Sequence, residues 1–267
     1  SDVYLSANAP ALIKINGECV PINNQILPID APRNLLSEVV PPDRIEELEE
    51  SGELNMGVPI KGIGRFRISA MRQRGSYAVV VRFISQQVPD FESLNLPPVL
   101  TELILEKRGL ILVVGATGSG KSTTLASMID TRNAVMSGHI LTIEDPIEFV
   151  INPAASVVTQ REISVDTPNF AQALRAALRE DINVLLVGEM RDLESISSAL
   201  TLAETGHLIF ATLHTNDAAQ TVDRIIDVFP AVQQGQIRAQ LASVLLGIVS
   251  LRLLPKIGGG RVPAYEI

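Results

Sequence analysis

Cysteine and aromatic residues are scarce in this sequence. Its 267 residues include a single cysteine, Cys19, no tryptophan and only 4% aromatic residues. One cysteine excludes an intrachain disulfide framework and a four-cysteine zinc site, so we expect a protein of the reducing cytoplasm that binds no zinc. The small number of aromatic rings leaves little surface on which nucleic-acid bases could stack.

Positive charge and long apolar runs are lacking as well. The 30 acidic residues outnumber the 22 lysines and arginines, and the net charge of −8 argues against a nucleic-acid-binding surface. The longest apolar run, residues 242–251, contains two serines and a glycine. It is too short to span a bilayer, which takes about 18 residues or more. We find no signal-peptide pattern at the start, so we expect a soluble protein that can still act at a membrane surface.

A glycine-rich loop is the most informative stretch that the sequence does contain. Residues 115–122 read Gly-Ala-Thr-Gly-Ser-Gly-Lys-Ser, which is the G-x-x-x-x-G-K-[ST] pattern of a phosphate-binding loop. The loop follows an apolar run typical of a buried strand and precedes a helical stretch, so its backbone N–H groups and the helix N-terminus would face one anion. The pattern predicts a nucleotide site, with Lys121 on the β- and γ-phosphates and the Ser122 hydroxyl on Mg²⁺. The residues expected to hold the nucleotide are Thr117, Gly118, Ser119, Gly120, Lys121, Ser122 and Thr123.

Two α/β domains are expected, joined by a linker. Residues 1–88 form the smaller N-terminal domain, residues 89–98 lack periodicity and are the linker, and residues 99–267 form the second domain. In the second domain apolar runs alternate with helical patterns, which predicts a parallel sheet with helices on both faces. The predicted strands are 110–114, 139–143, 184–187 and 208–213, and the predicted helices are 99–107, 121–135, 169–179, 195–203 and 233–253.

The first domain is expected to contain two hairpins with two helices between them. The first hairpin turns at Asn16-Gly17, a pair that favours a tight turn. The helices cover residues 33–39 and 43–51, the second with a capping box from Asp43 to Glu46.

The second hairpin, residues 64–84, sets two arginines against each other. If its turn near Arg74-Gly75 has two residues, Arg67 lies directly opposite Arg82. Like charges in that position destabilise a sheet unless an anion lies between them. Two splayed, hydrated arginines are the alternative, and a one-residue slip in register would remove the pairing.

Polar residues follow the predicted strands of the second domain at their carboxyl ends, where open α/β sheets bind ligands. They are Glu144, Asp145 and Glu148 after the second strand, Glu189 after the third and His214 after the fourth. Phosphoryl transfer to water needs one carboxylate to orient the nucleophile and another to hold Mg²⁺, so these residues predict a hydrolytic site. His207 lies at the opposite end of the strand that leads to His214, over about 20 Å away, and a structural or interface role is expected for it.

Four segments resemble the conserved motifs of the secretion-superfamily ATPases in order and spacing. They are residues 115–122 for Walker A, 142–148 for the Asp box, 187–192 for Walker B and 204–215 for the His box. Within this superfamily, the stretches at 160–162, 177–180 and 256–261 are similar to the retraction ATPases of type IV pili. The resemblance covers essentially the whole chain.

The resemblance implies a RecA-like P-loop ATPase domain that follows a smaller, PAS-like N-terminal α/β domain. It also implies roles for individual residues: Glu148 is the catalytic carboxylate, Glu189 supports the metal and water as the Walker B acid, Glu144 assists on the metal side, His214 senses the γ-phosphate, and Arg67 and Arg82 close onto the nucleotide. The cofactors implied are ATP or ADP and Mg²⁺.

For the whole protein, the resemblance implies a homohexameric motor at the cytoplasmic face of the inner membrane. Such a motor hydrolyses ATP to disassemble pilin, which produces twitching motility, and it works with a pilus platform protein of the inner membrane. The alternatives are an accessory or extension-type secretion ATPase, a slow nucleotide-gated binding module and a RecA-like nucleic-acid translocase. The absence of a four-cysteine zinc insertion favours retraction over extension.

The sequence departs from the family pattern in two places. Residues 181–184 read Asp-Ile-Asn-Val where the family usually has a Pro-Asp pair, and we expect little consequence. The chain also ends before the C-terminal helices of the retraction motors, which are therefore expected to be missing from it.

Overall fold

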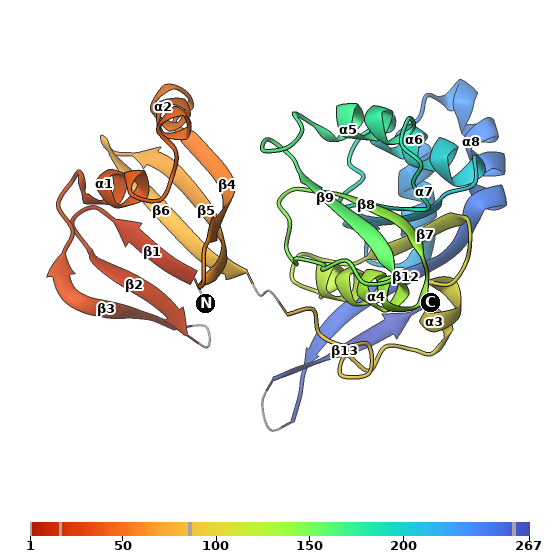
Figure 1. Ribbon diagram of the computed structural model, residues 1–267, viewed down its shortest axis with the longest axis horizontal. Helices are drawn as coiled ribbons and strands as arrows, with labels where there is room; N and C mark the ends of the chain where they lie inside the picture. Colours follow the sequence, from red (N-terminus) through yellow and green to blue (C-terminus); the bar gives the residue numbers. More distant parts are fainter. Residues whose placement is uncertain (1, 16–17, 85–86, 258–259) are drawn as a thin grey trace. The chain divides into compact units, whose positions relative to one another are not determined.

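The chain folds into two compact units, residues 1–86 and residues 87–267 (Figure 1). The computed structural model describes residues 2–15, 18–84, 87–257 and 260–267. Both units combine helices with sheets, so the α/β class predicted from the sequence is confirmed.

The first unit is an antiparallel sheet that carries two helices, as far as its described residues show. The strand order is β3-β2-β1-β6-β5-β4. Leu36 and Leu48 from the helices pack with Leu54, Ile68 and Val79 from three strands in one buried cluster, so the helices cover one face of the sheet. The elements are β1 (Asp2–Ser6), β2 (Pro10–Ile15), β3 (Glu18–Ile26), α1 (Ala31–Ser37), α2 (Pro42–Ser51), β4 (Glu53–Ile60), β5 (Gly64–Gln73) and β6 (Ser76–Ile84).

The predicted arginine register in the second hairpin is confirmed. Arg74 and Gly75 form the turn with φ angles of +46° and +75°, and Arg67 on β5 is the register partner of Arg82 on β6. The turn at Asn16-Gly17 lies outside the described residues, although Ile15 pairs with Glu18 on either side of it.

The two helices predicted in the first unit are found as α1 and α2, but the prediction differs from the structure in two respects. Strands β1 and β4 were not expected from the sequence. The capping box is also wrong, because α2 begins at Pro42 with Pro41 as its N-cap. Proline suits the first helical position because it has no N–H to satisfy, and Asp43 therefore lies inside the first turn.

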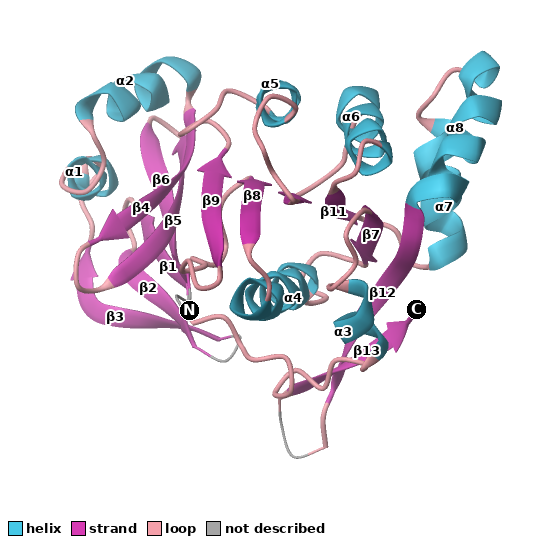
Figure 2. Cartoon of the chain, turned by 45° about the vertical axis from the view of Figure 1, so that its right-hand side comes forward, coloured by secondary structure: helices cyan, strands magenta, loops and turns pink. Residues whose placement is uncertain are grey.

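The second unit is a sheet of the order β13-β12-β7-β11-β10-β8-β9, with helices on both faces (Figure 2). Neighbouring strands are parallel except for β12 and β13. Side chains of β7 alternate between the faces: Leu110 and Leu112 pack toward α5–α8, whereas Ile111 and Val113 pack toward α3 and α4. The elements are α3 (Val99–Leu103), β7 (Gly109–Val114), α4 (Lys121–Val135), β8 (Gly138–Glu144), β9 (Ser156–Glu162), α5 (Phe170–Ala177), β10 (Val184–Val187), α6 (Leu193–Glu204), β11 (Leu208–Leu213), α7 (Ala218–Asp227), α8 (Ala231–Val244), β12 (Leu245–Pro255) and β13 (Arg261–Glu266).

The predicted helix 233–253 is wrong in its second half. Helix α8 ends at Val244, and Leu245–Pro255 forms β12, which runs parallel to β7. A short buried apolar run does not reveal by periodicity whether it is helix or strand. Strands β9 and β13 and helix α7 were not predicted, and α3 ends at Leu103 instead of residue 107.

No helix in the described part of the chain combines the length and the apolar composition needed to cross a bilayer.

Candidate active site

The glycine-rich loop joins β7 to α4 and needs its glycines for two physical reasons. Gly115 has a φ angle of +146°, and a Cβ atom there would lie 2.5 Å from the Leu251 carbonyl oxygen. Gly118 and Gly120 have φ angles of +77° and +100°, a region that other residues rarely adopt. The tight curl that the sequence predicted is therefore built from conformations open to glycine, and the loop ends at the N-terminus of α4.

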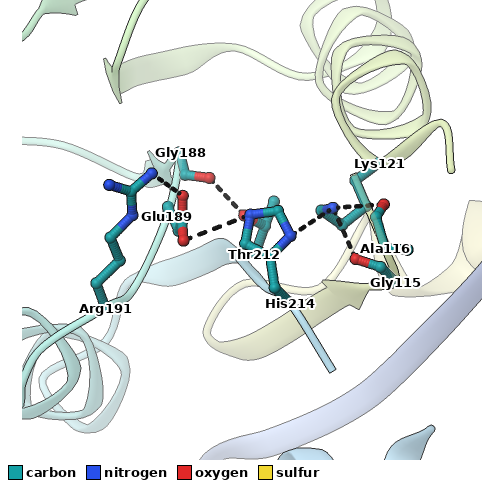
Figure 3. A network of polar contacts seen from close by, with 8 residues as sticks. All are labelled: Gly115, Ala116, Lys121, Gly188, Glu189, Arg191, Thr212 and His214. Carbon is teal, nitrogen blue, oxygen red and sulfur yellow. Dashed lines mark hydrogen bonds and ion pairs between the residues drawn. The ribbon is translucent and has the colours of Figure 1, made fainter. Parts of the chain in front are cut away.

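Lys121 belongs to this loop and lines a pocket; Figure 3 shows the polar contacts of its ammonium group. Its Nζ atom donates to the carbonyl oxygens of Gly115 at 2.8 Å and Ala116 at 3.1 Å, and lies 3.3 Å from Nδ1 of His214. The side chain is 8% exposed. Burial lowers the pKa of Lys121, and the carboxylates of Glu189 and Glu148 act in the opposite direction.

One pocket of about 880 Å³, including its open mouth, collects most of the predicted site. The predicted residues that line it are Thr117, Gly118, Lys121, Ser122, Glu144, Asp145, Glu148, Glu189 and His214. They come from the loop and from the carboxyl ends of β8, β10 and β11. The prediction that these strand ends bring acids and an imidazole to the phosphate-binding loop is confirmed as geometry.

Glu189 connects two basic side chains in this pocket. Its Oε2 atom accepts a hydrogen bond from Nη2 of Arg191 at 2.6 Å, and its Oε1 atom lies 3.4 Å from Nε2 of His214. Burial raises the pKa of the Glu189 carboxyl, but the bond and charge of Arg191 and the contact with His214 together hold it below its ordinary value. Lys121, His214, Glu189 and Arg191 therefore form one continuous polar chain across the pocket (Figure 3).

The backbone beside Glu189 is packed closely against its neighbours. A Cβ atom on Gly188 would lie 3.1 Å from the carbonyl oxygen of Ile143 on β8. The Thr212 hydroxyl donates to the Gly188 carbonyl oxygen at 2.5 Å. These contacts fix the turn after β10 between the ends of its two neighbouring strands.

The Glu144 carboxylate is held by hydrogen bonds from β8 and from the neighbouring strand β9. Its Oε1 atom accepts hydrogen bonds from the Thr142 hydroxyl at 2.7 Å and from Nε2 of Gln160 at 3.2 Å. Burial raises the pKa of Glu144, while these hydrogen bonds act in the opposite direction. Asp145 and Glu148 follow in the loop that leaves β8.

The remaining predicted site residues lie elsewhere. Ser119, Gly120 and Thr123 line a second hollow behind the glycine-rich loop, next to Leu253 and Tyr265. Arg67 and Arg82 belong to the first unit. The Arg82 guanidinium bonds to Asp2 at 2.7 Å and lowers the pKa of that carboxyl.

His207 lies at the start of β11, and His214 follows its end, so the predicted separation of the two histidines along this strand is confirmed. Nδ1 of His207 lies 3.0 Å from the Leu202 carbonyl oxygen.

Sequence reasoning missed two functional candidates, Arg191 and Gln160. Arg191 follows Glu189 by two residues. An arginine so close to an acid predicted to support Mg²⁺ could have been recognised from the sequence as its ion-pair partner. Gln160 lies on β9, which was not predicted as a strand, so its position in space could not be foreseen.

The donor set of the pocket fits Mg²⁺ bound beside a nucleotide. Within the described residues, no group of three or more histidine, cysteine, aspartate and glutamate side chains is arranged to hold a metal. Mg²⁺ in nucleotide sites is usually bound by one or two protein oxygens together with phosphates and waters. The Ser122 hydroxyl and the Glu189 carboxylate, which line the same pocket, are donors of this kind.

Comparison with known proteins agrees with this geometry. Residues 46–259 match the family described as type II/IV secretion system protein. The chain is 46% identical to the type IV pilus retractation ATPase PilT of Pseudomonas aeruginosa, over 100% of this chain and 78% of that protein. It is 42% identical to the type IV pilus ATPase PilU of the same organism, over 100% of this chain and 70% of that protein.

A crystal structure of the pilus retraction motor PilT with bound ADP has the same fold. The TM-score is 0.96 at 51% identity, and the match covers 100% of this chain and 78% of the other. Because these matches extend over both units and include the whole pocket, the chain belongs to the type II/IV secretion system protein family, in its PilT-like branch.

Proposed function

We propose that this chain is an ATPase that powers the retraction of type IV pili. The observation that carries the proposal is one pocket in which Lys121 and Ser122 of the glycine-rich loop meet Glu148, Glu189 and His214. A phosphate-binding lysine, a hydroxyl and paired carboxylates are the groups that hydrolysis of a nucleoside triphosphate requires.

We propose a role for each group. Lys121, whose ammonium group contacts the loop carbonyls and His214, would bind the β- and γ-phosphates. Glu148 would orient the attacking water. His214 contacts both Lys121 and Glu189, so it is placed to register whether a γ-phosphate has reached the lysine.

Ser122 and Glu189, with Glu144 next to them, would hold Mg²⁺. When bound, the ion supplies positive charge to the β- and γ-phosphate oxygens. The protein side chains would then bind the phosphates, orient the attacking water and keep other water away from the reacting phosphate.

The proposal includes the assembly. We place Arg67 and Arg82 as cations that close onto the nucleotide, within a homohexamer that works at the cytoplasmic face of the inner membrane with a pilus platform protein. The boundaries proposed for the parts are an N-terminal domain at 1–88, a linker at 89–98 and an ATPase domain from residue 99. The register that sets Arg67 opposite Arg82 on β5 and β6 supports this role, because two facing cations favour an anion beside them. The Asp2 carboxylate already contacts Arg82, so the nucleotide phosphates would add to an existing anion.

An accessory pilus ATPase is a second candidate, because the identity to PilU is only slightly lower than that to PilT. The two functions differ in whether the chain alone restores pilus retraction to cells that lack their own retraction motor. Restoration supports the retraction motor, and a requirement for a second ATPase supports the accessory role.

Changing Lys121→Ala tests the proposed chemistry. The variant should fold normally and lose ATP hydrolysis, because the lost ammonium group contacts loop carbonyls and His214 at the pocket and no apolar core side chain is removed. Circular dichroism and a phosphate-release assay measure the two properties. Lys107→Ala, which removes an exposed lysine of the same unit, is the matched control and should keep wild-type turnover. Full turnover in the Lys121→Ala variant would overturn the assignment.

A further inference from the structure

Strand β9 lies at the edge of the second sheet, beside β8 (Figure 2), and two of its side chains reach the loop that carries Glu148. The strands are parallel, with Thr142 opposite Gln160 and Glu144 opposite Glu162. The loop leaves β8 after Glu144 and passes along β9, so side chains of β9 on that face can contact its backbone.

Gln160 binds the loop through both ends of its amide. Its Oε1 atom accepts a hydrogen bond from the Ile151 backbone N–H at 2.8 Å, and its Nε2 atom donates to the Phe149 carbonyl oxygen at 2.9 Å. The same Nε2 atom donates to the Glu144 carboxylate at 3.2 Å. The side-chain amide therefore pairs with residues 149 and 151 as a neighbouring strand's peptide group would.

Glu162 holds the loop on the other side of Glu148. Its Oε2 atom accepts a hydrogen bond from the Ile147 backbone N–H at 3.2 Å, and its side chain is 1% exposed. Ile147 and Ile151 are themselves buried, at 6% and 5% exposed. The backbone is thus fixed at residue 147 and at residues 149 to 151, and Glu148 lies between these points and lines the pocket.

We infer that Gln160 and Glu162 are positioning residues that set the place of the Glu148 carboxylate in the pocket. The inference rests on the proposed function, in which Glu148 orients the attacking water. A carboxylate that orients water has to be held within a fraction of an ångström, since a misplacement of about 1 Å can cost about 10²-fold in rate. Residues 145–151 of the loop contain no glycine and belong to no strand, and the β9 side chains supply the support.

The variant Gln160→Met removes the hydrogen bonds while keeping the length of the side chain. We expect kcat for ATP hydrolysis to fall about 10–100-fold, as for other residues that orient a reacting group. The KM for ATP and the Kd for ADP should stay within about twofold, because the phosphate-binding loop is untouched. Val157→Thr changes an exposed position of β9 on the opposite face and should retain wild-type kcat. A wild-type kcat in Gln160→Met would overturn the inference.

A double variant tests whether Gln160 acts through Glu148. If it does, Gln160→Met should lower kcat no further in a Glu148→Gln background, because the group that it positions is already lost. An additional drop of the full single-variant size would show a general structural effect and contradict the inference. Glu162→Gln keeps an oxygen acceptor for Ile147 and should give a smaller loss than Gln160→Met.

Hydrogen exchange gives a readout that does not depend on activity. The amide of Ile151 should exchange at least about tenfold faster in Gln160→Met, since it loses its acceptor, and unchanged exchange would contradict the inference. The proposed function fails separately: if Glu148→Gln hydrolyses ATP at the wild-type rate, Glu148 is not the catalytic carboxylate, whatever the exchange rates show.

Discussion

The two sides of the nucleotide pocket are built in different ways. The glycine-rich loop, residues 115–122, takes its shape from glycines at positive φ angles, and the groups proposed to bind phosphate are its own backbone and Lys121. The loop that follows β8, residues 145–151, contains no glycine. Its backbone is held by hydrogen bonds with the side chains of Gln160 and Glu162, which belong to β9.

This difference explains why one side could be found by sequence motif and the other only in part. A loop shaped by its own residues carries its full signature in a few consecutive positions. When a loop is held by side chains of another strand, its carboxylates can be recognised in the sequence, but the residues that hold them cannot. The following predictions compare the two sides, beginning with the largest expected effect.

The end of β8 and the loop after it carry two glutamates with different surroundings, and Glu148→Gln should cost more activity than Glu144→Gln. Loss of a positioned acid or base typically costs about 10²–10⁴-fold in rate, and we expect a loss of this size for Glu148→Gln with ATP affinity retained. The Glu144 carboxylate is already bonded to Thr142 and Gln160, so Glu144→Gln should cost about tenfold or less. Single-turnover kinetics and nucleotide titrations measure both. The reverse order would make Glu144 the catalytic acid.

The glycine-rich loop should be sensitive to a single methyl group. Gly115→Ala places a Cβ atom 2.5 Å from the Leu251 carbonyl oxygen in a conformation that favours glycine, and such strain costs about 1–3 kcal/mol. We expect the affinity for ATP to fall about tenfold or more, because the loop has to open. Isothermal titration calorimetry measures the change.

Gly62→Ala is the matched control for this strain. Gly62 also has a positive φ angle, +79°, but the structure leaves open space around its Cβ position among the described residues. ATP affinity should be unchanged in this variant. If both substitutions weaken ATP binding equally, the close approach to Leu251 is not the cause.

The central strands of the second unit were predictable because they are buried on both faces. The predicted strands at 110–114, 139–143, 184–187 and 208–213 agree with β7, β8, β10 and β11 to within one residue at each end. Continuous apolar runs of this kind belong to the middle of a parallel sheet. Because parallel strand ends share one edge, the meeting of Glu148, Glu189 and His214 followed from the same pattern.

The edges of that sheet were not predictable from local sequence. Strand β9 contains Thr159, Gln160, Arg161 and Glu162 in succession, so it lacks the apolar alternation that marks a strand. The apolar start of β12 directly continues the helical pattern of α8, and only its pairing with β7 makes it a strand. The proposed positioning role of Gln160 could not be predicted from the sequence for this reason: it depends on tertiary contacts that sequence patterns do not encode.

The smallest predicted effect concerns Arg191 and the acid beside it. Arg191 and His214 hold the pKa of Glu189 below its ordinary value of 4.5, although burial alone would raise it. A group with a lowered pKa in the folded state stabilises the fold at higher pH and loses this contribution as the pH falls through the folded-state pKa. The Arg191→Met variant should therefore show a higher pKa for Glu189 and a smaller loss of stability between about pH 5 and pH 3 than the wild type. The Arg191 side chain is 68% exposed, so the effect on stability should be only about 0.2–1 kcal/mol.

Carboxyl chemical shifts followed by NMR give the pKa of Glu189 directly. Arg175→Met, which breaks the exposed ion pair with Glu194 in the same unit, should leave the Glu189 titration unchanged; an unchanged titration in Arg191→Met would show that His214 alone sets the pKa of this acid.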